Sequence, residues 1–207
     1  MKRSTVISMG ICIVSCLTST IAADDFDRLA AAVSATEGHS ANFTQTFRPH
    51  GSEEGLVESG TVIFGVLPQM RWTYDEPEKK VFVFDGETSW LYVPADRQVS
   101  VHRLTGSERN ALPFLVLKEE GKARQSFEIS SSKIDGTVRL MLTPKESTPI
   151  QSLVVSYDSE NRRINSIEYE DAEGNVTRFS LHNFRRVDHR PATFRLEVPS
   201  GVEVVEY

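Results

Sequence analysis

The side chains that most often carry out catalysis are scattered along this chain of 207 residues. No two histidines have the helical or strand spacing that would bring them to one metal ion. These histidines are His39, His50, His102, His182 and His189. Asp171 and Glu173 form a carboxylate pair, but their acidic, glycine-containing segment is typical of a solvated turn. Since hydrolase motifs and a phosphate-binding loop are also missing, the sequence predicts no enzyme, cofactor or metal site.

Residues 1–22 have the composition of a secretory signal peptide. Lys2 and Arg3 precede a short apolar run, and small residues follow it. We expect cleavage after Ala22 or Ala23, which leaves residues 23–207 as a single domain. A rival interpretation is a lipidated N-terminus at Cys16, because the preceding Ile-Val-Ser loosely resembles a lipobox. Soluble export is preferred, since the apolar run continues past this cysteine.

Cleavage would also change the composition of the chain. Both cysteines, Cys12 and Cys16, lie in the leader, so the mature chain would have no disulfide and no cysteine nucleophile. The 23 Lys and Arg residues fall to 21 without Lys2 and Arg3, against 29 Asp and Glu, so the formal charge changes from −6 to −8. An acidic chain without a basic cluster is a poor candidate for binding nucleic acid. We expect the periplasm as its compartment.

Apolar side chains fall at every second position from Gly60 to Val101, and this period predicts β-strands with one buried face. Turn-forming pairs such as Leu67-Pro68 and Asp85-Gly86 divide the stretch into an antiparallel meander. Alternation with turns resumes at Ser126 and continues to a last pair of strands over residues 192–198 and 201–207. We therefore expect a mainly β protein of ten to twelve strands.

Two segments outside the meander predict helices. Phe26, Leu29, Ala30 and Val33 share one face of an amphipathic helix. Residues 111–118 are too apolar to lie in water, and they predict either a short core helix or a lid over a curved sheet. The eleven Phe, two Trp and five Tyr likewise have two interpretations, an ordinary β core or a curved sheet around an apolar cavity.

Several motifs, in their order along the chain, resemble the outer-membrane lipoprotein carrier (LolA) family. Residues 41–46 (ANFTQT) are similar to the family's a-x-F-x-Q strand, and residues 83–92 are similar to its v-x-D-G-x-x-x-w-x-y hairpin. The other similar segments are residues 60–72, 112–117, 142–145 and 194–205. The resemblance covers nearly all of the mature chain.

The resemblance implies an unclosed antiparallel half β-barrel of about eleven strands, with short helices as a lid over an apolar cavity. It also implies a monomer that accepts acylated lipoproteins from an ABC-type release complex in the inner membrane and passes them to an outer-membrane receptor. The cavity would shield acyl chains, because burial of each methylene contributes about 0.8 kcal/mol. The alternatives on this scaffold are a periplasmic sensor or regulator that binds lipids or lipoproteins, and an outer-membrane receptor lipoprotein.

The expected lipid-binding cavity is lined by alternating strand residues and by three residues of the lid. These are Phe47, Phe64, Met70, Trp72, Phe84, Trp90 and Tyr92, with Phe114, Leu115 and Leu117. Family members often carry an Arg-Pro pair whose arginine holds the lid shut, but this chain has Val66 and Leu67 at that place. Arg71 is therefore the candidate lid lock or, alternatively, an exposed strand residue. We expect apolar contacts to hold the lid.

Overall fold

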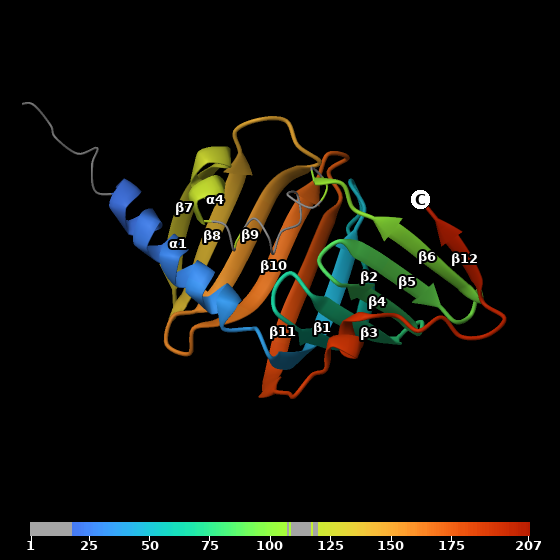
Figure 1. Cartoon of the computed structure of the whole chain (residues 1–207). Coiled ribbons are helices and arrows are strands. Elements are labelled where there is room, and N and C mark those ends of the chain that lie inside the picture. Colours follow the sequence, from blue (N-terminus) through green and yellow to red (C-terminus); the bar gives the residue numbers. More distant parts are fainter. Residues whose placement is uncertain (1–17, 107, 109–116, 118–119) are drawn as a thin grey trace, which may run out of the picture.

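The protein is represented by a computed structural model, which describes residues 18–106, 108, 117 and 120–207 (Figure 1). Over these residues the chain forms one 12-stranded sheet with a few short helices. The elements are α1 (Thr18–Ser34), β1 (His39–Arg48), β2 (Leu56–Phe64), β3 (Met70–Glu76), β4 (Lys80–Phe84), β5 (Thr88–Val93), β6 (Gln98–Arg103), α4 (Glu120–Ser126), β7 (Phe127–Ile134), β8 (Thr137–Pro144), β9 (Ile150–Asp158), β10 (Arg163–Asp171), β11 (Val176–Arg186), the 3-10 helix η1 (Pro191–Phe194) and β12 (Glu203–Glu206).

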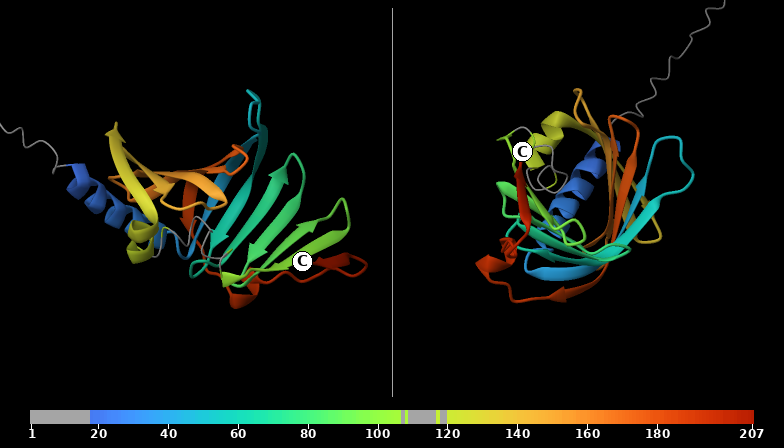
Figure 2. Two further views of the ribbon diagram at one scale, coloured as in Figure 1. Left: turned by 90° about the horizontal axis from the view of Figure 1, so that it is seen from above. Right: turned by 90° about the vertical axis from the view of Figure 1, so that its right-hand side faces the viewer.

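The sheet consists of two antiparallel meanders. β1 to β6 follow one another on one side and β7 to β11 on the other, and β1 pairs with β11 where the meanders meet. β12 adds a parallel strand beside β6. In the described part of the chain no pairing joins the outer strands β7 and β12, so the sheet curls without closing (Figure 2). The prediction of an unclosed half-barrel of about eleven antiparallel strands is confirmed, and the parallel strand is an addition to it.

α1 lies inside the curve of the sheet, against β7, β8 and β10 (Figure 2). Its side chains Phe26, Leu29 and Val33 are fully buried, as the amphipathic pattern predicts. Burial of a side chain of this size contributes about 1.5–3 kcal/mol, so the apolar face of α1 accounts for most of its attachment. The helix begins at Thr18, ahead of the predicted start at Asp25.

Contacts of residues 25–27, in the middle of α1, tie the helix to neighbouring elements. Arg124 of α4 forms an ion pair of 2.5 Å with Asp27, and its guanidinium lies 5.2 Å from the ring centroid of Phe26. The Tyr157 hydroxyl donates to the Asp25 carbonyl over 3.4 Å. Exposed ion pairs contribute about 1 kcal/mol or less, so these contacts set the position of α1 more than its stability.

The C-terminal segment differs from the predicted last pair of strands. Residues 191–194 form η1, and only Glu203–Glu206 form a strand, which pairs with β6 rather than with residues 192–198. The reason is the ring of Phe194, which is buried against β3 and the turn at Gly65. This contact holds residues 191–194 across the sheet. They therefore do not form a strand beside residues 203–206.

Candidate functional site

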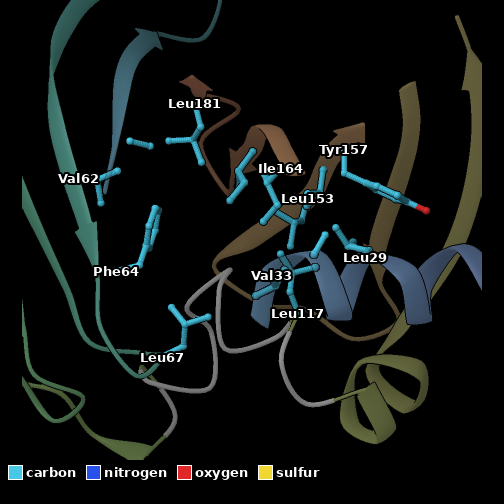
Figure 3. Close-up of a cluster of buried hydrophobic side chains, with 14 of the residues drawn as sticks. Leu29, Val33, Val62, Phe64, Leu67, Leu117, Leu153, Tyr157, Ile164 and Leu181 are labelled. Atoms are coloured by element: carbon cyan, nitrogen blue, oxygen red, sulfur yellow. The ribbon is translucent and has the colours of Figure 1, made fainter. Parts of the chain in front are cut away.

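The strand register defines which side chains share the inner, concave face of the sheet. Residues directly opposite each other in neighbouring strands project to the same face. Phe64 of β2 pairs with Met70 of β3, and Met70 pairs with Phe84 of β4. Trp72 pairs in the same way with Val62. These side chains belong to one buried cluster with Leu29 and Val33 of α1, so their face is the one that α1 covers (Figure 3).

Aromatic rings form the centre of this face. Phe43 meets Trp72 and Tyr74 edge to face, each at a centroid distance of 4.8 Å. Trp72 also lies 4.9 Å from Phe179 and 6.3 Å from Phe64. Such pairs contribute about 0.5–1.5 kcal/mol each beyond the burial of their area. The rings therefore make a continuous apolar surface that extends over β11, β1, β2 and β3.

Five of the predicted lining residues lie together in this cluster. Phe64, Met70, Trp72, Phe84 and Leu117 are all buried in it. Phe47 lies on the same face as Phe43 and is partly exposed. The predicted residues Phe114 and Leu115 lie outside the described residues. That any of these side chains contacts lipid stays a prediction.

Trp90 and Tyr92 do not share the face of Trp72. Trp90 pairs with Val83 and Tyr92 pairs with Val81, whereas Phe84 pairs with Ser89. Since neighbouring residues of a strand project to opposite faces, Trp90 and Tyr92 lie on the convex face. The prediction that all seven strand residues line one surface is therefore wrong for these two. The cause is the turn after Phe84, whose length shifts the alternation by one position.

The convex face of this half of the sheet is covered as well. Val83 and Val99 are fully buried there, and so is the ring of Phe194 from η1. The Arg71 guanidinium Nη1 donates to the Thr193 carbonyl oxygen over 3.4 Å. The candidate lid lock therefore lies on the convex face and contacts the C-terminal segment. It is partly buried, so the alternative of a simply exposed strand residue is not confirmed either.

Polar side chains gather where the aromatic surface ends. The Tyr74 hydroxyl donates to Gln45 Oε1 over 2.7 Å, and Lys80 Nζ lies 2.5 Å from Glu58 Oε1. The same Nζ lies 4.5 Å from the ring centroid of Tyr74. Burial raises the pKa of Tyr74, and the nearby Glu58 and Tyr169 raise it further. The alternation in the sequence predicted Tyr74 on the buried face of its strand, but it did not single out Glu58 or Lys80. The one available signal was a lysine at the start of the otherwise apolar strand β4.

The other candidate chemical groups form turns. The Asp171 carboxylate accepts hydrogen bonds from the Asn175 side chain and from the backbone N–H groups of Asn175 and Glu173, and these bonds lower the pKa of Asp171. The solvated-turn interpretation is therefore confirmed. Within the described ranges no three His, Cys, Asp or Glu side chains lie close enough to hold a metal ion. A membrane-spanning helix is likewise missing from that part of the chain.

These features define a class of protein: an open half-barrel whose apolar, aromatic inner face is partly covered by a helix. The chain belongs to the LolA family, because the family model "Outer membrane lipoprotein carrier protein LolA" matches residues 34–197. An outer-membrane lipoprotein carrier protein of Xanthomonas campestris pv. campestris (strain B100) is 30% identical over 82% of each chain. One of Chromohalobacter salexigens is 25% identical over 96% of this chain and 95% of its own.

Solved structures show the same fold. A conserved protein of Thermus thermophilus superposes with a TM-score of 0.55 and 14% identity, over 88% of this chain and 99% of its own. MucB superposes with a TM-score of 0.50 and 16% identity, over 90% of this chain and 66% of its own. At these identities the likeness extends to the fold alone.

Proposed function

We propose that this protein is a periplasmic carrier that binds the acyl chains of lipoproteins. It accepts them from an ABC-type release complex in the inner membrane, shields the chains from water, and delivers the cargo to an outer-membrane receptor. The observation that carries this proposal is the aromatic surface around Phe43 and Trp72 on the concave face. Membership of the lipoprotein carrier family supports the same role.

The energetics of acyl chains favour such a surface. Each methylene group removed from water contributes about 0.8 kcal/mol, so a cargo with several long chains needs many apolar contacts. Aromatic and aliphatic side chains supply these contacts without reading the protein sequence of the cargo. A carrier of this kind accepts many lipoproteins and recognises the part that they share.

Binding requires a rearrangement of the concave face. Phe64 and Phe84 are no more than 1% exposed, and Trp72 is 4% exposed, so acyl chains reach them only when covering groups move. Apolar side chains of α1 and Leu117 lie in the same buried cluster, with α1 over the β7–β10 side of the concave face, and we propose that they move to admit the acyl chains (Figure 3). Their contacts are apolar, and acyl chains can replace them with contacts of the same kind.

The two tryptophans provide a direct test, because they lie on opposite faces and are the only two in the chain. A Trp90→Phe variant keeps Trp72 as the fluorophore, and a Trp72→Phe variant keeps Trp90. Both are mixed with a triacylated lipopeptide whose acyl chains carry bromine, which quenches tryptophan on contact. We expect strong quenching in the Trp90→Phe variant and little in the Trp72→Phe variant.

Equal quenching in both variants, or stronger quenching of Trp90, would contradict binding on the concave face. Circular dichroism of both variants checks that each one keeps the fold. Native mass spectrometry of protein isolated from its own periplasm tests the cargo itself. An acylated lipoprotein bound at about one per carrier supports the proposal, whereas free phospholipid or glycolipid would assign the scaffold to lipid transport or sensing.

A further inference from the structure

We propose that the polar side chains at one end of the concave face bind the ester and amide carbonyl oxygens that link acyl chains to their cargo. This polar site consists of Gln45, Glu58, Tyr74 and Lys80. It fixes which way the cargo lies on the sheet. The inference rests on the proposed carrier function and adds a second, polar part to its binding surface.

The polar site is built from four neighbouring strands. Gln45 of β1 lies opposite Glu58 of β2, and Tyr74 of β3 lies opposite Lys80 of β4. Each polar residue except Glu58 follows or precedes an aromatic residue of the concave face by two positions, as Tyr74 follows Trp72. Two residues along a strand correspond to about 6.6 Å, so the polar site lies directly beside the aromatic surface.

The ion pair spans the ring of Tyr74. Lys80 and Glu58 come from the two strands that flank β3, and their charged atoms meet at 2.5 Å. The Lys80 ammonium lies 4.5 Å from the ring centroid of Tyr74. Only 23% of the Lys80 side chain and 19% of the Glu58 side chain are exposed. Both charges are therefore largely withdrawn from water at the border of an apolar surface.

Stability alone does not account for this arrangement. Removing two charges from water is unfavourable, and apolar side chains of similar volume often serve a fold equally well. Apolar side chains fill the adjoining positions of the same strands, as Phe82 does in β4. The geometry of the charged pair at the border of the aromatic surface is therefore the ground for assigning it a role in binding.

The chemistry of the polar site suits an uncharged oxygen acceptor. A lysine ammonium has three donors, and its contacts here are with one carboxylate oxygen and one ring face, which leaves donor capacity for a ligand. The Gln45 side chain accepts from Tyr74 through its oxygen, and its amide nitrogen is a further donor. Because Glu58 already balances Lys80, the site favours neutral carbonyl groups over a second negative charge.

The order of the two surfaces gives the cargo a direction. Tyr74 and Lys80 adjoin the β3–β4 turn, whereas Phe64, Met70 and Phe84 lie at the opposite ends of their strands. Carbonyl groups held at the polar site therefore direct the acyl chains toward Phe64. The peptide part of the cargo leaves the sheet past the turns at residues 49–55 and 77–79.

The test compares Lys80, which belongs to the polar site, with Lys79, which is its exposed neighbour in the sequence. Lys80→Met removes the ammonium of the polar site, and Lys79→Met removes an exposed neighbour and causes the same change in net charge. Binding is measured for a triacylated lipopeptide and for N-phenyl-1-naphthylamine, an apolar probe without carbonyl groups. We expect Lys80→Met to weaken lipopeptide binding about tenfold, or ~1.4 kcal/mol, and to leave probe binding unchanged. Lys79→Met should change neither affinity.

Other outcomes separate this inference from the carrier proposal. If the wild type binds the lipopeptide and the two lysine variants bind it equally well, the polar site is refuted and the carrier function stands. If the wild type binds neither ligand, the carrier function fails, and this inference fails with it. Should Lys80→Met fold poorly, Lys80→Arg and Tyr74→Phe replace it. The arginine is expected to keep most of the affinity for lipopeptide, and equal losses for both ligands would overturn the inference.

Discussion

The Phe194 ring lies directly over Gly65, where there is no room for another side chain. A Cβ atom at residue 65 would come within 2.6 Å of the ring atoms Cε2 and Cζ. Because Phe194 is only 1% exposed, the ring is enclosed and cannot swing away freely. Gly65 therefore allows the C-terminal segment to approach the convex face of the sheet.

A Gly65→Ala substitution should destabilise the protein by about 1–3 kcal/mol, the usual cost of overpacking a core. The loss should be much smaller in a Phe194→Ala background, where the ring that the methyl group meets is absent. Urea unfolding of the two single variants and the double variant measures this coupling. Gly106→Ala is the control, because a Cβ there would meet nothing within 4 Å. Additive losses would contradict the close contact.

Phe43 should be among the most sensitive positions of the concave face. It is 1% exposed and meets both Trp72 and Tyr74 at 4.8 Å, so Phe43→Ala leaves a cavity and removes two ring contacts. We expect a loss of about 3–5 kcal/mol in the free energy of unfolding. Asn42→Ala, on an exposed position of the same strand, should change stability by about 0.5 kcal/mol or less. Similar losses for the two variants would show that Phe43 is not in the core.

Arg71→Leu should leave access to the concave face unchanged. The Arg71 side chain lies on the convex face and bonds to the Thr193 carbonyl, so its removal loosens the C-terminal segment and not the cover of the aromatic surface. Binding of an apolar dye is expected to stay within about twofold of the wild type, because the lost hydrogen bond lies on the opposite face of the sheet and distant sites affect each other little. Limited proteolysis near residues 187–200 should become faster.

A sharp rise in dye binding by Arg71→Leu, with the fold intact, would instead assign this arginine to holding the cover. The hypothesis that apolar contacts hold the cover would then fail. Leu117→Ala is the matched comparison, because Leu117 is fully buried within the concave cluster. This variant should raise dye access where Arg71→Leu does not.

Tyr74 should make stability depend on pH in alkaline solution. Folding raises the pKa of Tyr74 through burial, above the ordinary value of about 10. The contribution of the protonated Tyr74 hydroxyl to the free energy of unfolding is therefore complete below about pH 10. It is lost as the pH rises toward the folded-state pKa, at up to about 1.4 kcal/mol per pH unit. Burial also raises the pKa of Tyr157, which adds to the same slope.

Unfolding in urea at several pH values between 9 and 11 checks this slope (about one unit on either side of the ordinary pKa). Tyr74→Phe keeps the ring and removes the ionising hydroxyl, so its stability should fall less steeply than that of the wild type. Tyr207→Phe is the control, since Tyr207 is 76% exposed. An unchanged slope in Tyr74→Phe would contradict the burial of this hydroxyl.

The sequence predicted the strands well because their alternation has a direct physical cause. Met70, Trp72 and Tyr74 alternate with polar residues because only one face of β3 meets the core, and all three are buried as expected. The helical face of Phe26, Leu29 and Val33 was predicted for the same reason. The open topology came from the family resemblance, since strand pairing between distant segments leaves no local pattern.

The sequence assigned Trp90 and Tyr92 to the wrong face because the alternation of apolar and polar residues is lost in the strand before them. In β4 the residues Val83 and Phe84 are both buried and every residue after Lys80 is apolar, so alternation cannot be followed through the strand. The turn that follows then sets the phase of Trp90, and its register is a matter of turn geometry. The position of η1 was likewise not predictable, because it depends on the space that Gly65 leaves 129 residues earlier in the chain.

The burial of β4 on both faces has a mechanical consequence. Val83 packs toward the convex side and Phe84 toward the concave side, and each is no more than 1% exposed. A sheet with packed layers on both sides resists bending more than a sheet with one bare face, and its amide protons exchange mainly through global opening. We therefore expect the sheet around β4 to bend little. If the proposed carrier function holds, we therefore expect α1, whose contacts with the concave cluster are apolar, to move more than this part of the sheet when cargo binds.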